Sequence, residues 1–177
     1  MGSYSAAKLR ALSDACGLAR GSYARGAALE DFVEHVFLSV QSVRLYARDI
    51  QDEDGSQEVD LVFTHYHPLS RLPMPDVTII VECKNEKLRV SAAHVREFGN
   101  KLRTRSMNIG ILVTSAGLSG RPGRHGHAAI RDELQNGVAI IILTANELAV
   151  LQTPDDLVGL LTNRLNELST FRGYRSI

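Results

Sequence analysis

A chain of 177 residues, of which 44% are hydrophobic and 23% charged, has the composition of an ordinary globular protein and can bury the core of one domain. Its 20 basic and 20 acidic residues cancel, which argues against a protein held to nucleic acid by overall charge. No apolar run approaches the roughly 20 residues that cross a membrane, and two cysteines make no disulfide framework, so we expect a cytoplasmic protein with no membrane partner.

The first part of the chain predicts two helices and a β-hairpin. A short amphipathic helix runs from about Ser5 to Ala19, and a stronger one from about Ala27 to Val40 has apolar residues at helical spacing. Residues 42–49 and 58–63 alternate on either side of a polar turn at 51–57, which is the pattern of a hairpin. Residues 64–76 contain three prolines and are predicted to form a loop.

The second part of the chain alternates apolar runs with helical patterns. The runs at 77–83, 109–115 and 138–143 predict strands that are buried on both faces. Helices are expected from Ser91 to about Arg105, over 128–136, and from Thr153 to about Leu168, with a capping box at Thr144–Glu147 and a glycine-rich loop at 117–126.

This order of elements indicates an α/β protein: a single-domain α/β/α sandwich with a mixed central sheet, antiparallel at its start and parallel later. We assign residues 1–22 to an N-terminal helix and connection, 23–150 to a core, and 151–177 to a C-terminal helix.

The charges are distributed unevenly along this chain. Between Lys84 and Arg105 lie seven basic residues and two acidic ones, whereas residues 30–60 are mostly acidic. A basic patch beside an acidic cluster suits a metal-using enzyme that acts on a polyanion, although charge runs are equally often solvated surface. The candidates for binding nucleic-acid phosphates are Lys87, Arg89, Arg96 and Lys101.

Two carboxylates and a lysine are expected to converge at one edge of the sheet. Glu82 and Lys84 are two apart at the end of the most apolar strand, so their side chains share a face. Asp60 comes from the preceding strand, and Glu30 is available from the helix beneath. Asp60 and Glu82 would hold Mg²⁺, with Glu30 completing the coordination directly or through water. Lys84 would position or deprotonate the attacking water, or stabilise the charge of the transition state.

Structural explanations compete with these assignments. The three central residues would also form a buried salt-bridge network, but such networks rarely repay the desolvation of their charges. For Glu30 the alternative is a solvated helix edge. His65 and His67 have the spacing of a possible zinc pair, but no partner cluster follows, so we interpret them, like His125 and His127, as loop features.

The pattern Asp60…Glu82-Cys83-Lys84 resembles the D…(D/E)-x-K signature of the PD-(D/E)xK nuclease superfamily. Val59 stands where the signature has proline, and Glu82 stands where many members of its Mrr-like branch carry glutamine.

Further segments resemble that Mrr-like, type IV restriction endonuclease branch: GAALEDFV at 26–33, VREFG at 95–99 and ILVTSAGLS at 111–119. The resemblance covers about residues 26–148. It implies a restriction-endonuclease-like core and DNA hydrolysis with Mg²⁺ or Mn²⁺. Asp60 and Glu82 would be the metal ligands, and Lys84 the catalytic base or electrostatic partner.

The leading hypothesis is therefore a metal-dependent endonuclease acting on DNA, in defence against foreign DNA or in DNA repair. The alternatives are a catalytically silent nucleic-acid-binding or assembly module that kept the fold, or a nuclease acting on RNA or branched DNA. A degenerate module normally loses a ligand or the lysine, and none is missing here. A separate specificity or sensor subunit is a further possible partner. A homodimer or larger assembly would be simplest for cutting both strands. The last helix offers an apolar face that would serve either this contact or the core: Leu157, Leu160, Leu161 and Leu165.

One ambiguity concerns which aspartate is catalytic. Pro75-Asp76 matches the superfamily's written name more literally than Val59-Asp60 does. On one extended strand, however, Asp76 and Glu82 would lie about 20 Å apart, too far to share an ion. We therefore expect Asp60 to be the catalytic residue.

Overall fold

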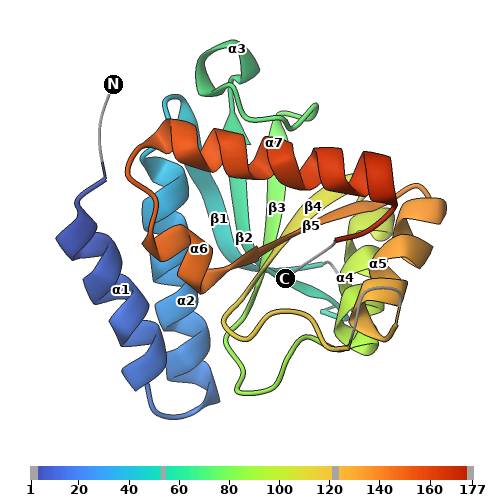
Figure 1. The fold of residues 1–177 in the computed structure, drawn as a ribbon, viewed down its shortest axis with the longest axis horizontal. Coiled ribbons are helices and arrows are strands. Elements are labelled where there is room, and N and C mark those ends of the chain that lie inside the picture. Colours follow the sequence, from blue (N-terminus) through green and yellow to red (C-terminus); the bar gives the residue numbers. More distant parts are fainter. Residues whose placement is uncertain (1–3, 53–54, 121–123, 175–177) are drawn as a thin grey trace.

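A computed structural model describes residues 4–52, 55–120 and 124–174, which form a five-stranded sheet with helices packed around it (Figure 1). The strands are β1 (Val43–Gln51), β2 (Glu58–His65), β3 (Thr78–Lys84), β4 (Ile109–Thr114) and β5 (Ala139–Thr144). The helices are α1 (Ala6–Leu18), α2 (Ser22–Leu38), α3 (His67–Ser70), α4 (Ala92–Thr104), α5 (Gly126–Gln135), α6 (Ala145–Ala149) and α7 (Pro154–Phe171).

The strands follow one another in chain order across the sheet, β1-β2-β3-β4-β5. β1, β2 and β3 pair antiparallel, whereas β3, β4 and β5 pair parallel. The direction changes at β3 because α4 and α5 provide the crossovers that parallel neighbours require, while β1 and β2 are joined by a short turn. The predicted mixed sheet, antiparallel first and parallel later, is confirmed.

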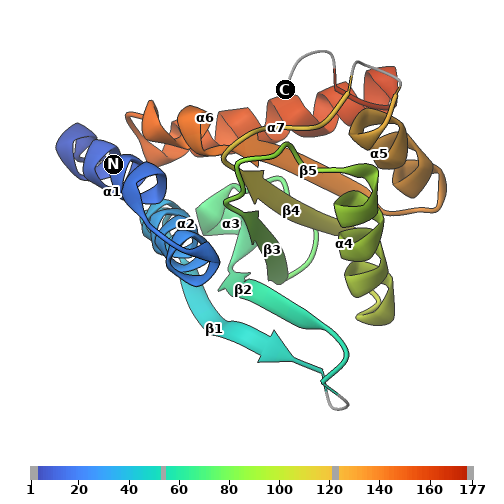
Figure 2. The same cartoon turned by 90° about the horizontal axis from the view of Figure 1, so that it is seen from below.

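Helices cover both faces of this sheet. α2 packs against β1, β2 and β3 on one side, and α4 and α5 lie on the other side, against β4 and β5 (Figure 2). All six residues of β4 are buried, and so are the five central residues of β3, as expected for strands covered on each face. The structure is therefore the α/β/α sandwich that the sequence predicts.

The outer edge of β5 is closed by one tyrosine. The Tyr174 hydroxyl donates to the carbonyl oxygen of Ile140 over 2.7 Å and accepts from the backbone N–H of Ile142 over 3.1 Å. Without Tyr174 these two groups of an edge strand would need water or another chain as partners.

Several element boundaries differ from the prediction. α2 begins at Ser22 rather than near Ala27, because the break in the chain lies at Gly21, whose φ of 88° no helix can adopt. Gly17, also expected to interrupt, lies inside α1. Parts of the predicted turn at 51–57 and of the loop at 117–126 lie outside the described residues.

The proline-rich segment after β2 contains α3 and is held by His65. Its Nε2 lies 2.8 Å from the carbonyl oxygen of Asp76 and must carry the proton, so Nδ1 accepts from the Ser70 hydroxyl at 2.6 Å. Both ring nitrogens are thereby occupied, which leaves His65 unable to form the zinc pair considered for it.

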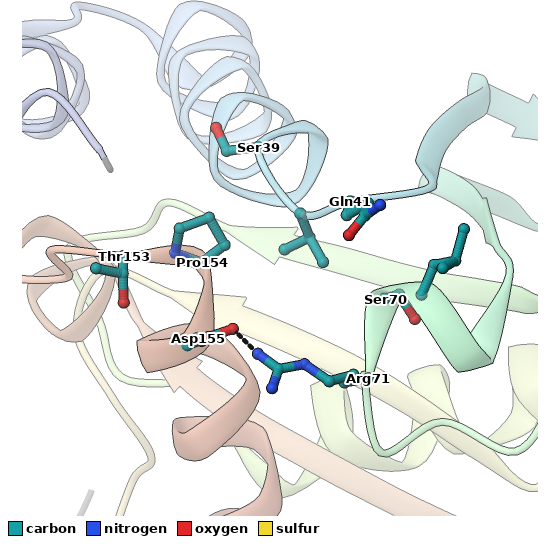
Figure 3. Close-up of a pocket in the computed structure, with 9 residues that line it drawn as sticks. Ser39, Gln41, Ser70, Arg71, Thr153, Pro154 and Asp155 are labelled. Atoms are coloured by element: carbon teal, nitrogen blue, oxygen red, sulfur yellow. Dashed lines mark hydrogen bonds and ion pairs between the residues drawn. The ribbon is translucent and has the colours of Figure 1, made fainter. Parts of the chain in front are cut away.

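A cavity of about 370 Å³ lies beside α3, with an ion pair between Arg71 and Asp155 on its wall (Figure 3).

The leucines of α7 serve the core. Leu157 and Leu161 are buried, and Leu160 and Leu165 pack partly buried against the same cluster. The apolar face considered for dimerisation is therefore directed into the molecule. Within the three described ranges, no helix has the length and hydropathy needed to cross a membrane.

Candidate active site

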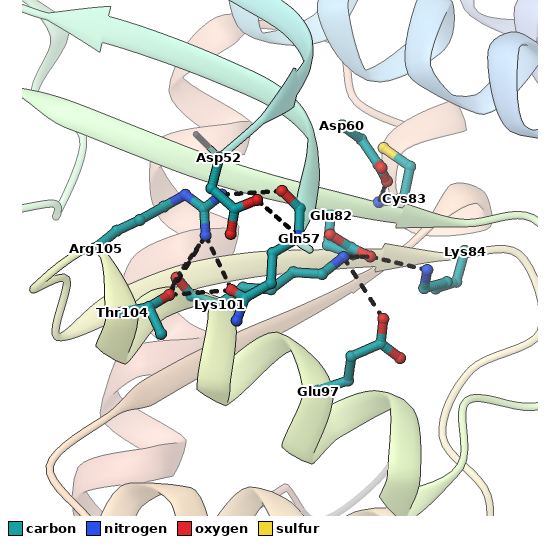
Figure 4. A network of polar contacts seen from close by, with 10 residues as sticks. All are labelled: Asp52, Gln57, Asp60, Glu82, Cys83, Lys84, Glu97, Lys101, Thr104 and Arg105. Carbon is teal, nitrogen blue, oxygen red and sulfur yellow. Dashed lines mark hydrogen bonds and ion pairs between the residues drawn. The ribbon is translucent and has the colours of Figure 1, made fainter. Parts of the chain in front are cut away.

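The pairing of β2 with β3 brings Asp60 to the end of β3. The register joins Leu61 to Val81, so Asp60 lies one position beyond, level with Glu82. The Asp60 carboxylate is partly buried and accepts a hydrogen bond of 2.6 Å from the backbone N–H of Cys83 (Figure 4). This bond fixes the carboxylate against the strand that carries Glu82 and Lys84.

Glu82 is the most enclosed charge of the cluster, with 1% of its surface exposed. Its Oε1 lies 2.8 Å from the Nζ of Lys84 and 2.8 Å from the Nζ of Lys101, so two ammonium groups share one oxygen. The other oxygen, Oε2, is buried and has no hydrogen-bond partner among the described residues. A buried carboxylate oxygen without a donor is costly unless something else binds it.

The surroundings of Asp60 disfavour ionisation of its carboxyl group. Burial, followed by the charge of Glu82, raises the pKa of Asp60 to about 7, although the Cys83 N–H and the Lys84 ammonium act in the opposite direction. A cation placed between the two carboxylates would relieve this repulsion.

Lys84 is held in its charged form. Burial alone would lower its pKa, but the negative charges of Glu82 and Asp60 more than offset burial, and the net shift is upward. Deprotonating a water requires the opposite, a lysine of depressed pKa. Of the three roles considered for Lys84, deprotonating the water is therefore disfavoured, whereas positioning the water and stabilising negative charge are both compatible with an ammonium.

Lys101 lies in a different place from the one predicted. Expected as a surface contact for phosphates, it is only 7% exposed and points from α4 onto Glu82, with Glu97 a second ion-pair partner at 3.7 Å. The sequence offered one indication, since Lys101 lies beside the buried Phe98 and Leu102 of α4, at the edge of the apolar stripe.

A second set of contacts fixes α4 relative to the hairpin. Arg105, which follows α4, donates to the side-chain oxygen of Gln57 at 3.1 Å and to its backbone oxygen at 3.3 Å. Thr104 donates to the same side-chain oxygen at 3.0 Å (Figure 4). Since Gln57 directly precedes β2, these bonds fix the position of α4, which carries Lys101, relative to β2, which carries Asp60. No local pattern in the sequence indicates these contacts.

Glu30 reaches the neighbourhood of the site but is bound to Arg48. The Oε2 of Glu30 lies 3.0 Å from the Arg48 guanidinium, which also pairs with Asp31 at 2.8 Å and Glu34 at 3.2 Å. The negative charge of Glu30 contributes to the raised pKa of Asp60, so Glu30 is close enough to act on the site through its charge. Among the residues that the structure describes, no three His, Cys, Asp or Glu side chains are grouped closely enough to hold a metal ion.

The remaining residues predicted to bind phosphates lie on the surface. Lys87 and Arg89 are exposed beyond β3, and Arg89 donates to the carbonyl oxygen of Leu118 at 3.5 Å. Arg96 forms a long ion pair of 3.6 Å with Asp132. Their role in binding nucleic acid stays a prediction.

Comparison with known proteins places the chain in a family. The sequence model of a protein family, the Mrr catalytic domain, matches residues 24–151, which is well over half of the chain. This family is described as restriction endonuclease. The chain belongs to the Mrr-like restriction endonucleases. The assignment to the PD-(D/E)xK nucleases made from Asp60, Glu82 and Lys84 is thereby confirmed at the level of the family.

The fold of this Mrr-like protein also occurs in solved structures. One of them is the DNA modification-dependent restriction endonuclease AspBHI, which superposes with a TM-score of 0.50 at 17% sequence identity. The superposition covers 93% of this chain but only 43% of AspBHI, so the Mrr-like chain spans less than half of that protein's length. A search of the curated proteins found no match to this Mrr-like chain.

Proposed function

We propose that this Mrr-like protein hydrolyses phosphodiester bonds in DNA with a divalent metal ion, Mg²⁺ or Mn²⁺, held by Asp60 and Glu82. The main observation behind this proposal is that the buried Oε2 of Glu82 has no hydrogen-bond partner in the described part of the chain. Glu82 lies level with Asp60 on the neighbouring strand.

The donor set suits such an ion. Mg²⁺ prefers carboxylate oxygens and usually keeps several waters, so one or two carboxylates from the protein are sufficient. Asp60 and Glu82 supply two, and burial together with the charge of Glu82 raises the pKa of Asp60, which a bound divalent ion would lower. Glu30 would add a third carboxylate only by loosening its ion pair with Arg48, so we assign it an outer position.

The protein's own groups have distinct tasks in this mechanism. A bound divalent ion supplies positive charge and acidifies a water molecule. Lys84, kept as an ammonium, lies at the strand end where the phosphate would sit and stabilises the negative charge that develops on it. Lys101 holds Oε1 of Glu82, so Oε2 would be available to hold the ion.

The biological setting that we propose is defence against foreign DNA, with DNA repair as the alternative. A catalytically silent module is disfavoured because Asp60, Glu82 and Lys84 are all present and brought together. A separate specificity or sensor subunit is the partner that we propose for recognising a particular DNA sequence or modification.

The test is a cleavage assay on plasmid, linear duplex, single-stranded DNA and RNA, with Mg²⁺, with Mn²⁺ and with EDTA. We expect cleavage of DNA that EDTA abolishes and that Glu82→Ala lacks. Absence of turnover on all four substrates, together with no metal binding by calorimetry, would refute the proposal.

A further inference from the structure

A cleft of about 650 Å³ lies next to the segment that follows Lys84. One wall is the end of α1, the α1–α2 turn and the start of α2, and the other wall is formed by the segments that follow β3 and β4. Its lining comprises residues 16–21, Arg25, residues 85–87, Ser115 and Ala116.

The walls of this cleft are fixed to the proposed catalytic strand. The side-chain amide of Asn85 donates to the carbonyl oxygens of Cys16 at 3.1 Å and Arg25 at 2.7 Å, which ties α1 and α2 to the residue after Lys84. On the opposite wall, the backbone N–H of Ser115 donates to the carbonyl oxygen of Lys84 at 3.2 Å. A ligand in the cleft would therefore be held at a defined place relative to the Lys84 side chain.

The cleft is lined by three cationic side chains. Arg20, Arg25 and Lys87 all line it, and none of the three forms an ion pair with a described residue. The Nε of Arg25 is buried and likewise has no hydrogen-bond partner in the described ranges. Glu86 is the one acidic residue of the lining, so the charge there is positive although the whole chain is neutral. An unpaired, partly buried guanidinium is a group that an anion would satisfy.

Part of this cleft lies outside the family match. The match begins at residue 24, whereas Arg20 and the end of α1 precede it. Two large side chains on either side of the α1–α2 turn are also exposed: Leu18, the last residue of α1, with 78% and Tyr23, at the start of α2, with 89% of its surface accessible. Basic and aromatic side chains exposed close together are typical of surfaces that bind nucleic-acid strands.

We propose that this cleft binds the phosphates of the nucleic-acid strand next to the bond that is cut, through Arg20, Arg25 and Lys87. The inference rests on the proposed function for its ligand, because it deepens the description of that same site. It makes α1 and the α1–α2 turn a substrate-binding element, attached to the catalytic centre by Asn85.

The test is the binding of a fluorescein-labelled DNA duplex, and of one of its single strands, measured by anisotropy in EDTA over a series of KCl concentrations. The variant is Arg20→Ala/Lys87→Ala. The matched control is Lys8→Ala/Arg44→Ala, which removes the same two charges from exposed positions outside the cleft. Melting temperatures and Mn²⁺ titrations of all three proteins establish that the fold and the metal site are unchanged.

We expect the cleft variant to bind about tenfold more weakly and its salt slope to fall by roughly 2, since each lost phosphate contact removes close to one counterion. The control should match the wild type. This result supports the inference whether or not the wild type cleaves DNA, and the stronger of the duplex and single-strand arms identifies the bound form. Equal affinity and slope in the two double variants would overturn it even if the protein proves to be a nuclease. No binding of either oligonucleotide by the wild type would also overturn it.

Discussion

The carboxylate of Asp60 is bound to the backbone of Cys83, whereas Asp76 is exposed at the opposite end of β3 and contributes its carbonyl oxygen to His65. Only Asp60 therefore lies where an ion shared with Glu82 would be held. We expect Asp60→Asn to abolish metal-dependent cleavage and Asp76→Asn to retain most of it, in initial rates measured on plasmid DNA. Circular dichroism provides the control that both variants fold. Equal loss in two folded proteins would contradict this assignment.

Lys101 acts on the site through Glu82. Lys101→Met keeps most of the side-chain volume but leaves Oε1 of the buried carboxylate with Lys84 as its only ammonium partner among the described residues. Because groups that orient a metal ligand typically affect activity by 10–100-fold, we expect kcat to fall by about that factor. Lys8→Met, an exposed lysine of α1, is the matched control and should leave kcat unchanged. A Lys101→Met enzyme as fast as the wild type would remove Lys101 from the mechanism.

The raised pKa of Asp60 makes metal binding depend on pH. Below about 7 the carboxylate is protonated in the metal-free protein, so an incoming ion must displace that proton. We expect the apparent Mn²⁺ affinity to fall by about tenfold per pH unit below 7 and to level off above it. Calorimetry in buffers of different ionisation enthalpy measures the proton released. Near neutral pH, release of no proton would show that Asp60 is already ionised.

At the scale of elements, hydrophobic patterns predicted most of the architecture. β3 and β4 have continuous apolar runs because both of their faces are covered. β1 and β2 alternate because mainly one face of each is covered. The patterns placed Asp60, Glu82 and Lys84 on the strands that bring them together. They did not show that Arg48 binds Glu30, because a partner on a neighbouring edge strand depends on how α2 docks.

Lys101 illustrates the same limit. Periodicity predicts which residues of α4 face inward, but the rotation and position of the helix on the sheet decide whether a residue at the border of the stripe meets solvent or Glu82. That position depends on tertiary contacts such as Arg105 with Gln57, residues 48 apart in the sequence. Local sequence patterns carry no information on such pairs.

The closed edge of β5 leads to a prediction about stability. In Tyr174→Phe the carbonyl oxygen of Ile140 and the N–H of Ile142 lose their buried partner while packing is retained. We expect a loss of about 1–3 kcal/mol in the free energy of unfolding, measured by urea denaturation. Tyr46→Phe, on the exposed bulge of β1, should change it little. Equal stability of the two variants would mean that water replaces the hydroxyl at β5.

At the scale of the whole molecule, a chain of zero net charge has two carboxylates together at the end of β3 and, in the adjacent cleft, three cations without an ion-pair partner among the described residues. Without a divalent ion, enclosing the ionised carboxylate of Asp60 opposes folding, because burial and the charge of Glu82 both disfavour that ionised form. A metal ion that binds only the folded state should therefore stabilise the entire domain, not only the site.

The size of that stabilisation follows from mass action. At a metal concentration about 100 times the dissociation constant, the folded state gains about 2.7 kcal/mol, and a domain of this length shifts by roughly 2–4 °C for each kcal/mol. We expect Mn²⁺ to raise the melting temperature of the wild type and of Asp76→Asn by roughly 5–10 °C. Asp60→Asn and Glu82→Gln should show little of this shift, because each removes one of the two carboxylates. KCl of matched ionic strength controls for screening. A shift of the same size in all four proteins would place the bound ion elsewhere on the molecule, whatever the cleavage assay shows.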